Sequence, residues 1–471
     1  MIKKLKIKLI IFILIPLFVL FFNTLKPMPS GTSFEGYARI GNFTFLSDLT
    51  YEKDGKRAYD QEIFTEIFKL IKESNKFILI DYFLFNDDYD RNLNNVFPEI
   101  SKNLTDALLE KKRLNLNLPI ILITDPINFA YGSYVPKHIE ELKKVGVQVV
   151  VTNLFKLRDS NALYSSYYRP YFSWFPNSKN GIFKNAFDPD KPNISLASYL
   201  ELFNLKANHR KIIMNEKNAI ISSANPHDGS FFHSNIAFKV DGAILEDILT
   251  SEKGIMRLSN ANMDMVSKFH PNTQTSGKTQ MKFITEGKIK EEILNRINST
   301  NLDNKIKIGM FYLSDRDIIK SLKKASDRGV LIQIILDINK DAFGRKKIGI
   351  PNKPVANELM AKKNIEIRWY ETKGEQYHSK FIIIEQGEKV RIIGGSANYT
   401  RRNIGDLNLE ANIAIYLDKN SEEVEKILNY YDKIWNNKGG IYTAKYEKYR
   451  EKSTFKKLLY LIQEETGLSS F

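Results

Sequence analysis

The chain contains no cysteine among its 471 residues, which excludes disulfides, thiolate metal sites and a cysteine nucleophile. Histidine is scarce as well, with six residues, so any catalytic imidazole comes from a small set. Acidic residues are outnumbered, because 55 Asp and Glu face 70 Lys and Arg, and the net charge is +15. This charge favours an anionic partner, either a phospholipid surface or nucleic acid, although a lysine-rich solvated surface explains it equally well.

Only one long apolar run is present, and it lies at the N-terminus. After the basic stretch MIKKLKIK, apolar residues follow almost without a break from Leu9 to Phe22. The pattern predicts a membrane anchor or signal segment outside the fold, and the lack of an Ala-x-Ala-like site favours an uncleaved anchor. Four lysines precede the run and one closely follows it. The positive-inside rule therefore predicts a cytoplasmic N-terminus and an extracytoplasmic body on the cell membrane.

The rest of the chain alternates predicted helices and strands, and it does so twice. The first half has helical patterns at 60–74, 104–112 and 136–145 between strand patterns at 77–85, 119–125 and 147–151. The second half repeats this order with helices at 288–297, 317–328 and 357–363 and strands at 306–313, 331–337 and 365–370. Alternation of this kind predicts an α/β fold, and the repeat predicts two such lobes facing each other. The predicted segments are the anchor (1–26), a linker (27–43), the first lobe (44–250), the second lobe (251–440) and a basic tail (441–471).

Two segments have no counterpart in the repeat. The insertion 153–205 is dense in aromatic residues, which suit a contact with lipid headgroups or a lid, or else pack on the lobe itself. The tail has apolar residues at mixed helical spacing among basic ones. It is predicted to be either an interfacial helix or a helix that caps the last lobe.

A motif occurs once in each half of the chain. HRKIIMNE (209–216) is followed by SSAN (222–225), and HSKFIIIE (378–385) is followed by GSAN (395–398). The two histidines are 169 positions apart, and each copy then reaches a further matching stretch, SNIAF (234–238) or ANIAI (411–415). Such extended similarity makes a chance match a remote alternative.

The motif supplies the groups that phosphoryl transfer needs. Residues two apart in a strand share a face, so His209 projects with Lys211 and His378 with Lys380. Short polar side chains follow at the end of the next strand: Ser223, Asn225, Ser396 and Asn398. Together the lysines, amides and hydroxyls suit the non-bridging oxygens of a phosphodiester. Two imidazoles supply a nucleophile and a general acid without a metal or any other cofactor.

A zinc site is the alternative use of the histidines. His209, His227 and His233 have suitable side chains, but their spacing fits no helix face and suggests no second shell of supporting groups. We therefore predict no metal.

The paired motif resembles the signature of the phospholipase D superfamily: His-x-Lys, four residues, Asp, then Gly-Ser-x-Asn, occurring twice. The resemblance extends over about 44–438 and implies two pseudo-symmetric α/β/α lobes that share one active site. It departs from the signature in carrying Glu216 and Glu385 at the Asp positions and Ser222 at the first Gly position.

The resemblance also implies roles for the site residues. One histidine forms a phosphohistidine with the substrate while the other protonates the leaving alcohol, and we assign His209 as nucleophile and His378 as acid. An acidic residue past the second motif commonly orients a catalytic histidine in the family, and Glu410 occupies that place. Its counterpart in the first half is His233, so the partner of one catalytic histidine is not identified from sequence.

The superfamily includes phospholipases, phosphatidyltransferases such as cardiolipin synthases, and metal-independent nucleases. The predicted anchor, the aromatic insertion and the basic body favour a phospholipid membrane as partner and an anionic phospholipid as substrate. The chain most resembles the bacterial cardiolipin synthase-like branch, whose members usually carry two N-terminal membrane segments where this chain has one. A membrane-anchored nuclease and an inactive lipid-binding scaffold are the alternatives. The oligomeric state is not predicted.

Overall fold

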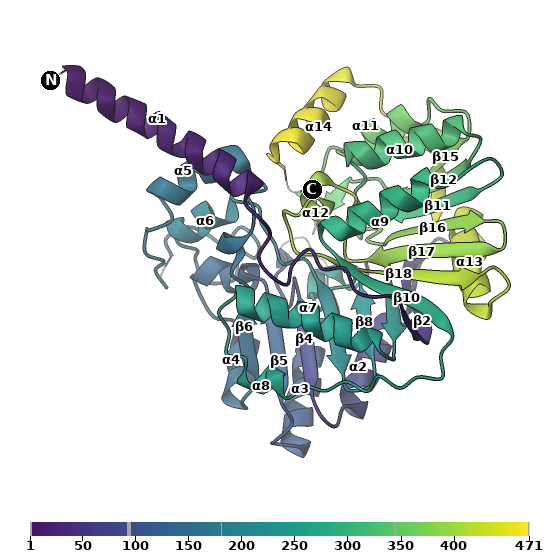
Figure 1. The fold of residues 1–471 in the computed structure, drawn as a ribbon, viewed down its shortest axis with the longest axis horizontal. Helices are drawn as coiled ribbons and strands as arrows, with labels where there is room; N and C mark the ends of the chain where they lie inside the picture. The colour runs from purple at the N-terminus through teal and green to yellow at the C-terminus, as the bar shows by residue number, and fades with distance from the viewer. Residues whose placement is uncertain (1, 92–95, 180, 343–344, 470) are drawn as a thin grey trace.

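Two β-sheets with the same strand order form the body of the protein (Figure 1). The computed structural model describes residues 2–91, 96–179, 181–342, 345–469 and 471. The order of the first sheet is β3-β2-β9-β8-β7-β4-β5-β6 and that of the second is β1-β10-β18-β17-β16-β11-β12-β15-β19. From β2 to β6 and from β10 to β15 the two orders match strand by strand. The predicted α/β fold with a repeated lobe is therefore confirmed.

The first sheet is built from strands in the first half of the chain. Its strands are β2 (Phe43–Lys53), β3 (Lys56–Gln61), β4 (Ile78–Tyr82), β5 (Ile120–Thr124), β6 (Gln148–Val151), β7 (Lys211–Asn215), β8 (Ala219–Ser222) and β9 (Asn235–Val240). Strands β4, β5 and β6 run parallel, whereas β7 pairs antiparallel with both β4 and β8. All residues of β4, β5 and β7 are buried, as expected for apolar strands covered on both faces.

The second sheet repeats this arrangement and gains strands at both edges. Its strands are β10 (Thr279–Thr285), β11 (Lys305–Met310), β12 (Leu331–Asp337), β15 (Ile365–Tyr370), β16 (Lys380–Gln386), β17 (Lys389–Gly395) and β18 (Ala411–Asp418), with β1 (Arg39–Gly41) and β19 (Thr443–Lys445) at the edges. Strands β13 (Asp341–Ala342) and β14 (Arg345–Lys346) form a separate hairpin. The predicted linker and tail thus each supply an edge strand, and the predicted domain boundaries remain predictions.

Helices cover the outer faces of both sheets and fill the space between them. Helices α2 (Ile63–Glu73), α3 (Ile100–Leu114) and α4 (Lys137–Lys144) pack on the first sheet. Helices α9 (Gly287–Asn298), α10 (Arg316–Asp327) and α11 (Asn352–Leu359) pack on the second. A third apolar core joins the inner faces of both sheets with α7 (Ile244–Leu258) and α13 (Glu422–Trp435). This shared core holds the two lobes together. The short helices α8 (Asp264–Ser267) and α12 (Arg401–Ile404) lie in connections.

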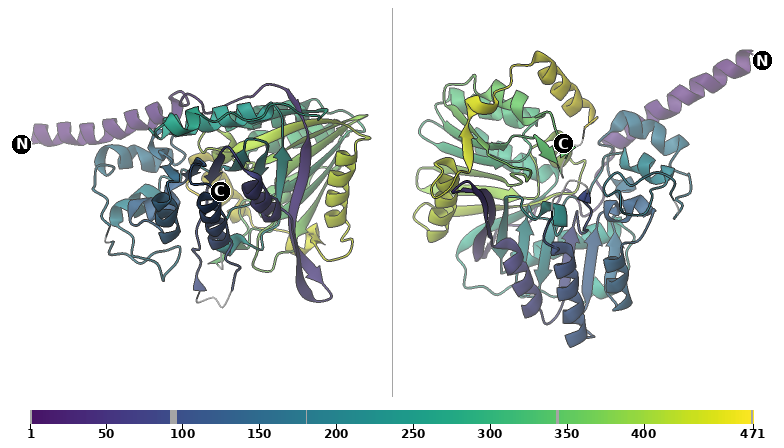
Figure 2. Two further views of the ribbon diagram at one scale, coloured as in Figure 1. Left: turned by 90° about the horizontal axis from the view of Figure 1, so that it is seen from below. Right: turned by 180° about the vertical axis from the view of Figure 1, so that it is seen from behind.

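The N-terminal helix α1 (Ile2–Leu25) projects from the body and packs along α5 (Ala162–Tyr171) of the insertion (Figures 1 and 2). The ring of Phe12 stacks on that of Tyr171 at 4.8 Å. Among the helices of the described residues, none is long and apolar enough to cross a membrane. The predicted membrane-spanning segment therefore has no support in the structure.

The insertion and the tail are both folded. The insertion contains α5 and α6 (Leu196–Leu202), and the tail ends in α14 (Thr454–Thr466). Tyr460 and Glu464, on one face of α14, are buried against the second lobe. The prediction of a capping helix in the tail is therefore confirmed.

Candidate active site

The two histidine motifs meet where the lobes exchange backbone hydrogen bonds. The amide of His209 donates to the carbonyl of Leu409 in the second lobe, at 2.8 Å. The amide of His378 donates to the carbonyl of Ser234 in the first lobe, also at 2.8 Å. Each histidine thus lies beside the segment that precedes β18 or β9 of the opposite lobe. The partner of each ring lies at the junction of that segment with the strand, Glu410 just before β18 and Asn235 at the start of β9.

Both histidines line one cavity of about 580 Å³. Their ring centroids are 6.5 Å apart, and both rings are largely buried. Asn225 and Asn398 line the same cavity, one from each lobe. The Oδ1 of Asn225 accepts a hydrogen bond from the amide of Leu84, which leaves its NH₂ group to donate to an anion.

The two lysines occupy equivalent positions beside the cavity. The ammonium group of Lys211 donates to the carbonyl of His209, and that of Lys380 donates to the carbonyl of His378, both at 2.6 Å. Each lies 5.1 Å from the centre of a phenylalanine ring, that of Phe83 or Phe311. Burial lowers the pKa of Lys211 to about 7, and burial together with the charge of Lys211 lowers the pKa of Lys380 well below its ordinary value. A bound phosphodiester would restore the positive charge on both.

His209 has a carboxylate partner from the opposite lobe. Its Nδ1 lies 2.8 Å from Oε1 of Glu410. Asn403 also donates to Oε1, and Ser396 donates to Oε2. Because an ionised carboxylate only accepts, Nδ1–H donates and Nε2 keeps its lone pair. Burial raises the pKa of Glu410, but His209 and Lys211 outweigh it and the net pKa lies below the ordinary value. Burial lowers the pKa of His209 to about 4, so this ring is neutral at neutral pH.

His378 has a neutral partner that the sequence did not identify. Its Nδ1 lies 3.1 Å from Oδ1 of Asn235, and the amide is oriented by Ser223, which donates to Oδ1, and by the carbonyl of His233, which accepts from Nδ2. Nδ1 of His378 therefore donates, and Nε2 faces the cavity. The partner lies two positions beyond His233, the counterpart of Glu410. The repeat of the asparagine in SNIAF and ANIAI was the signal that marked this position.

The serines lie behind the histidine partners. Ser396 donates to Glu410 and accepts from the amide of Ala411, and Ser223 makes the equivalent pair of bonds with Asn235 and the amide of Ile236. Both side chains are fully buried. Their contacts orient the partner of each histidine, and their predicted contact with phosphate oxygens stays a prediction.

The glutamates at the Asp positions of the signature lie at the far ends of their strands. Glu216 accepts hydrogen bonds from the amides of Asn75 and Lys76 at 3.1 and 3.2 Å, and Glu385 pairs with Lys307. Neither lines the cavity. They stabilise the strand ends, which explains why glutamate replaces aspartate there without disturbing the histidines.

Replacement of Glu410 by glutamine tests the carboxylate without changing the side-chain shape. Turnover at pH 7 is expected to fall by about 10²-fold to 10³-fold, because an amide stabilises the cationic histidine far less than a carboxylate does. Steady-state kinetics measure the loss. The matched variant Asn235→Asp places a carboxylate beside the other histidine, and its turnover decides whether that position requires a neutral partner. An unchanged rate in Glu410→Gln would remove Glu410 from the site.

The lowered pKa of Lys211 predicts how activity depends on pH. The lysine is cationic below about pH 7 in the free protein and neutral above it. For bis(p-nitrophenyl) phosphate, whose leaving group needs no proton, kcat/KM should fall as the pH rises through 7. The kcat should begin to fall only at a higher pH, because the bound anion raises the lysine pKa. A pH profile of both constants provides the test, and a flat kcat/KM from pH 6 to 9 would contradict it.

Among the described residues, no group of three His, Asp or Glu side chains is placed to hold a metal ion. Both ring nitrogens of His227 have partners, Ser230 and the carbonyl of Asp88. His233 lies 5.7 Å from His378, ring centre to ring centre. The histidines of the alternative zinc site are therefore not arranged as ligands.

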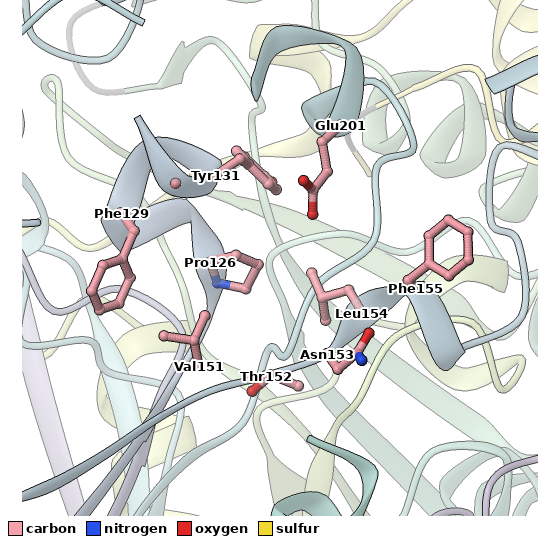
Figure 3. Close-up of a pocket in the computed structure, with 10 residues that line it drawn as sticks. Pro126, Phe129, Tyr131, Val151, Thr152, Asn153, Leu154, Phe155 and Glu201 are labelled. Carbon is pink, nitrogen blue, oxygen red and sulfur yellow. The ribbon is translucent and has the colours of Figure 1, made fainter. Parts of the chain in front are cut away.

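A second cavity of about 300 Å³ lies beside Tyr131, which also lines the histidine cavity (Figure 3). Its walls are mainly apolar, and the carboxylate of Glu201 points into it. Burial raises the pKa of Glu201 to about 7. None of the motif residues lines this cavity, so the chemistry belongs to the larger one.

Comparison with known proteins finds a family match in the second half of the chain. Residues 293–435 match the family model described as "Cardiolipin synthase, PLD-like domain". No curated protein sequence matches the chain. The structure of phosphatidylserine synthase from Haemophilus influenzae Rd KW20 is similar over 90% of this chain and 94% of its own, with 11% identity and a TM-score of 0.54. At that identity the likeness shows a shared fold.

Two further solved structures have TM-scores too low to support an argument. Polyphosphate kinase from Porphyromonas gingivalis has a TM-score of 0.44 at 11% identity, over 83% of this chain and 50% of its own. The phospholipase D family member Nuc from Salmonella typhimurium has a TM-score of 0.26 at 20% identity, over 34% of this chain and 97% of its own. The paired motifs line one cavity, and residues 293–435 match a phospholipase D-like domain, so the chain is similar to the phospholipase D superfamily in its motifs and in that part of its sequence.

Proposed function

We propose that the protein transfers the phosphatidyl group of a phospholipid to water or to an alcohol through a phosphohistidine intermediate, without a metal. The observation that carries this proposal is the single cavity in which a carboxylate-paired His209 faces His378. The family match of residues 293–435 supports a reaction at a phosphodiester.

The first step forms the intermediate. Burial and the charge of Lys380 lower the pKa of His378 well below its ordinary value in the free protein, and a bound phosphodiester anion raises it again, so that the ring takes up a proton with the substrate. Nε2 of His209 then attacks phosphorus, the bond from phosphorus to the headgroup oxygen breaks, and protonated His378 gives its proton to that oxygen. Lys211 and Lys380, with the amides of Asn225 and Asn398, stabilise the charge on the non-bridging oxygens. Glu410 stabilises the positive charge that develops on His209.

The second step reverses the proton transfer. Neutral His378 takes a proton from water or an alcohol, the freed oxygen attacks phosphorus, and the bond to Nε2 of His209 breaks. The histidine is regenerated as the phosphatidyl product forms. The acceptor decides between hydrolysis and transfer.

The cavity walls favour a lipid over a polynucleotide. On one side the wall is apolar and includes Leu84, Ile127, Phe187, Leu202 and Leu205, the last three from the insertion. Such a wall suits the glycerol and acyl portion of a lipid. Elsewhere the lining includes Asp88 and Asp90, whose charges oppose a polyanionic strand. It also includes four basic residues that would attract any phosphate group: Lys206, Lys346, Lys347 and Arg402. The nuclease is therefore the second candidate, supported by the net charge and by these basic lining residues.

Membrane attachment belongs to this proposal too. The order of basic and apolar residues at the N-terminus is the reason to propose that the protein attaches to the cell membrane by this segment, with the catalytic body outside the cytoplasm. Fusion of a reporter to each end of the chain, followed by protease accessibility in intact cells, tests this orientation.

Product analysis tests the proposed reaction. The purified protein is incubated with phosphatidylglycerol vesicles and a chelator, and the lipids are identified by mass spectrometry. Cardiolipin with glycerol would establish transfer, and phosphatidic acid alone would establish hydrolysis. Activity is expected to persist with the chelator. Lipids identical to those made by His378→Ala would contradict the proposal, and cleavage of single-stranded DNA would then favour the nuclease. The absence of any reaction together with lipid binding would favour the inactive scaffold.

A further inference from the structure

The outer face of α14 carries an apolar stripe that the body of the protein does not cover. Phe455, Leu458 and Ile462 are 70%, 57% and 48% exposed, and their spacing of three and four residues places them on one side of the helix. The opposite side is anchored, because Tyr460 donates to the carbonyl of Ser314 at 2.8 Å and Glu464 accepts from Ser314 at 2.8 Å. The helix is therefore held rigidly with its apolar stripe facing outward.

Lysines lie near this stripe, Lys452 just before the helix and Lys457 about 100° around the helix from Leu458. Lys452 and Lys457 belong to the same segment, and neither forms an ion pair with any described residue. Lys456 pairs with Glu451 at 2.6 Å. A helix with exposed apolar residues and free lysines matches a bilayer interface, where acyl chains cover the former and anionic headgroups neutralise the latter. A protein partner would have to supply acidic groups around an apolar strip.

The same helix reaches the active-site cavity. Arg402, which lines the cavity, donates to the carbonyl of Gly467 at the end of α14, at 2.7 Å. The insertion also extends from the cavity to the surface, because Phe187 lines the cavity and Trp174 is 68% exposed. Figures 1 and 2 place α14 and the α5–α6 region on the same side of the molecule, with the C-terminus between them. Both segments thus connect an exposed apolar surface with residues that line or contact the lining of the cavity.

We propose that the outer face of α14 docks on an anionic bilayer and holds the cavity against the lipid. The proposal rests on the proposed function in that the bilayer supplies the substrate. The docking itself requires no turnover. A cell-surface protein or a second copy of this chain is the alternative occupant.

The absence of cysteine makes a site-specific probe straightforward. Leu458→Cys is labelled with an environment-sensitive fluorophore, and Asn117→Cys, in the exposed loop after α3, is the matched control. With phosphatidylglycerol vesicles the Leu458 probe should shift to shorter wavelength and brighten, and the control should not change. Vesicles of phosphatidylcholine alone should give a smaller effect. An unchanged Leu458 probe would overturn the proposal. So would a shift that appears without vesicles and grows with protein concentration, which would indicate a second copy.

A charge on the stripe separates docking from chemistry. Leu458→Glu should lower turnover of phosphatidylglycerol in vesicles by about tenfold or more, and leave turnover of soluble bis(p-nitrophenyl) phosphate at the parental value. Equal vesicle rates for parent and variant would overturn the proposal. If the parent turns over no lipid, the proposed function fails, while the fluorescence result still decides the docking.

Discussion

Replacement of His209 by alanine is expected to lower turnover by roughly 10⁴-fold to 10⁶-fold, the range seen when a covalent nucleophile is removed. The reason is that no other side chain offers a lone pair at the same place: His209 alone is both neutral at pH 7 and backed by a carboxylate. The loss of turnover should be the same for substrates with good and with poor leaving groups. Rates with phosphatidylglycerol and with bis(p-nitrophenyl) phosphate measure this loss.

The control for this variant is another histidine. His270 is exposed and does not line the cavity, so His270→Ala should keep the parental rate. Circular dichroism and thermal unfolding confirm that His209→Ala is folded. A loss smaller than about tenfold in the folded variant would show that His209 is not the nucleophile.

Replacement of His378 by alanine is expected to separate substrates by their leaving groups. With a phospholipid, whose alcohol leaves only when protonated, turnover should fall by about 10²-fold to 10⁴-fold. With bis(p-nitrophenyl) phosphate the first step needs no proton, so one equivalent of p-nitrophenol should be released in a burst. The second step then stalls, because no base activates water. Rapid-mixing absorbance measures the burst.

The opposite assignment predicts the opposite pattern. If His378 were the nucleophile, His378→Ala would lose activity on both substrates equally and release no burst of p-nitrophenol. The burst would then be seen with His209→Ala. The asymmetric partners make the two assignments physically different: a carboxylate stabilises the charge on a phosphorylated imidazole, and an amide oxygen does so only weakly.

The fold was predictable because both lobes use strong patterns. The strand predicted at 365–370 coincides with β15, and the helix predicted at 317–328 is shifted by one residue from α10. The helix predicted at 357–363 begins five residues too late, because apolar positions in Asn352–Leu359 are fewer and Pro354 lies inside it. Edge strands β1 and β19 were not predicted. They are three residues long, and only pairing with β10 and β15 defines them.

Most of the site residues that could be predicted from the sequence belong to the repeated motif. Matching residues at equivalent places brought both histidines, lysines and asparagines into one region, and Glu410 was identified from the resemblance to the family. Asn235 was missed because the exchange of segments between lobes places it beside His378, a contact between residues 143 positions apart. The asparagine repeated in SNIAF and ANIAI marks Asn235 in the sequence, but not its contact with His378. The apolar wall from the insertion was missed for the same reason.

The central claim is that the two histidines form one site in which His209 carries the phosphatidyl group. Rapid quenching of the wild-type reaction with phosphatidylglycerol into alkali, followed by peptide mass spectrometry, tests it most directly, because phosphohistidine survives alkali. The account predicts an adduct on the peptide that contains His209, as the phosphatidyl group or, where alkali has removed the acyl chains, as the glycerophosphoryl group. An adduct on the peptide that contains His378, or turnover with no adduct on either, would contradict it.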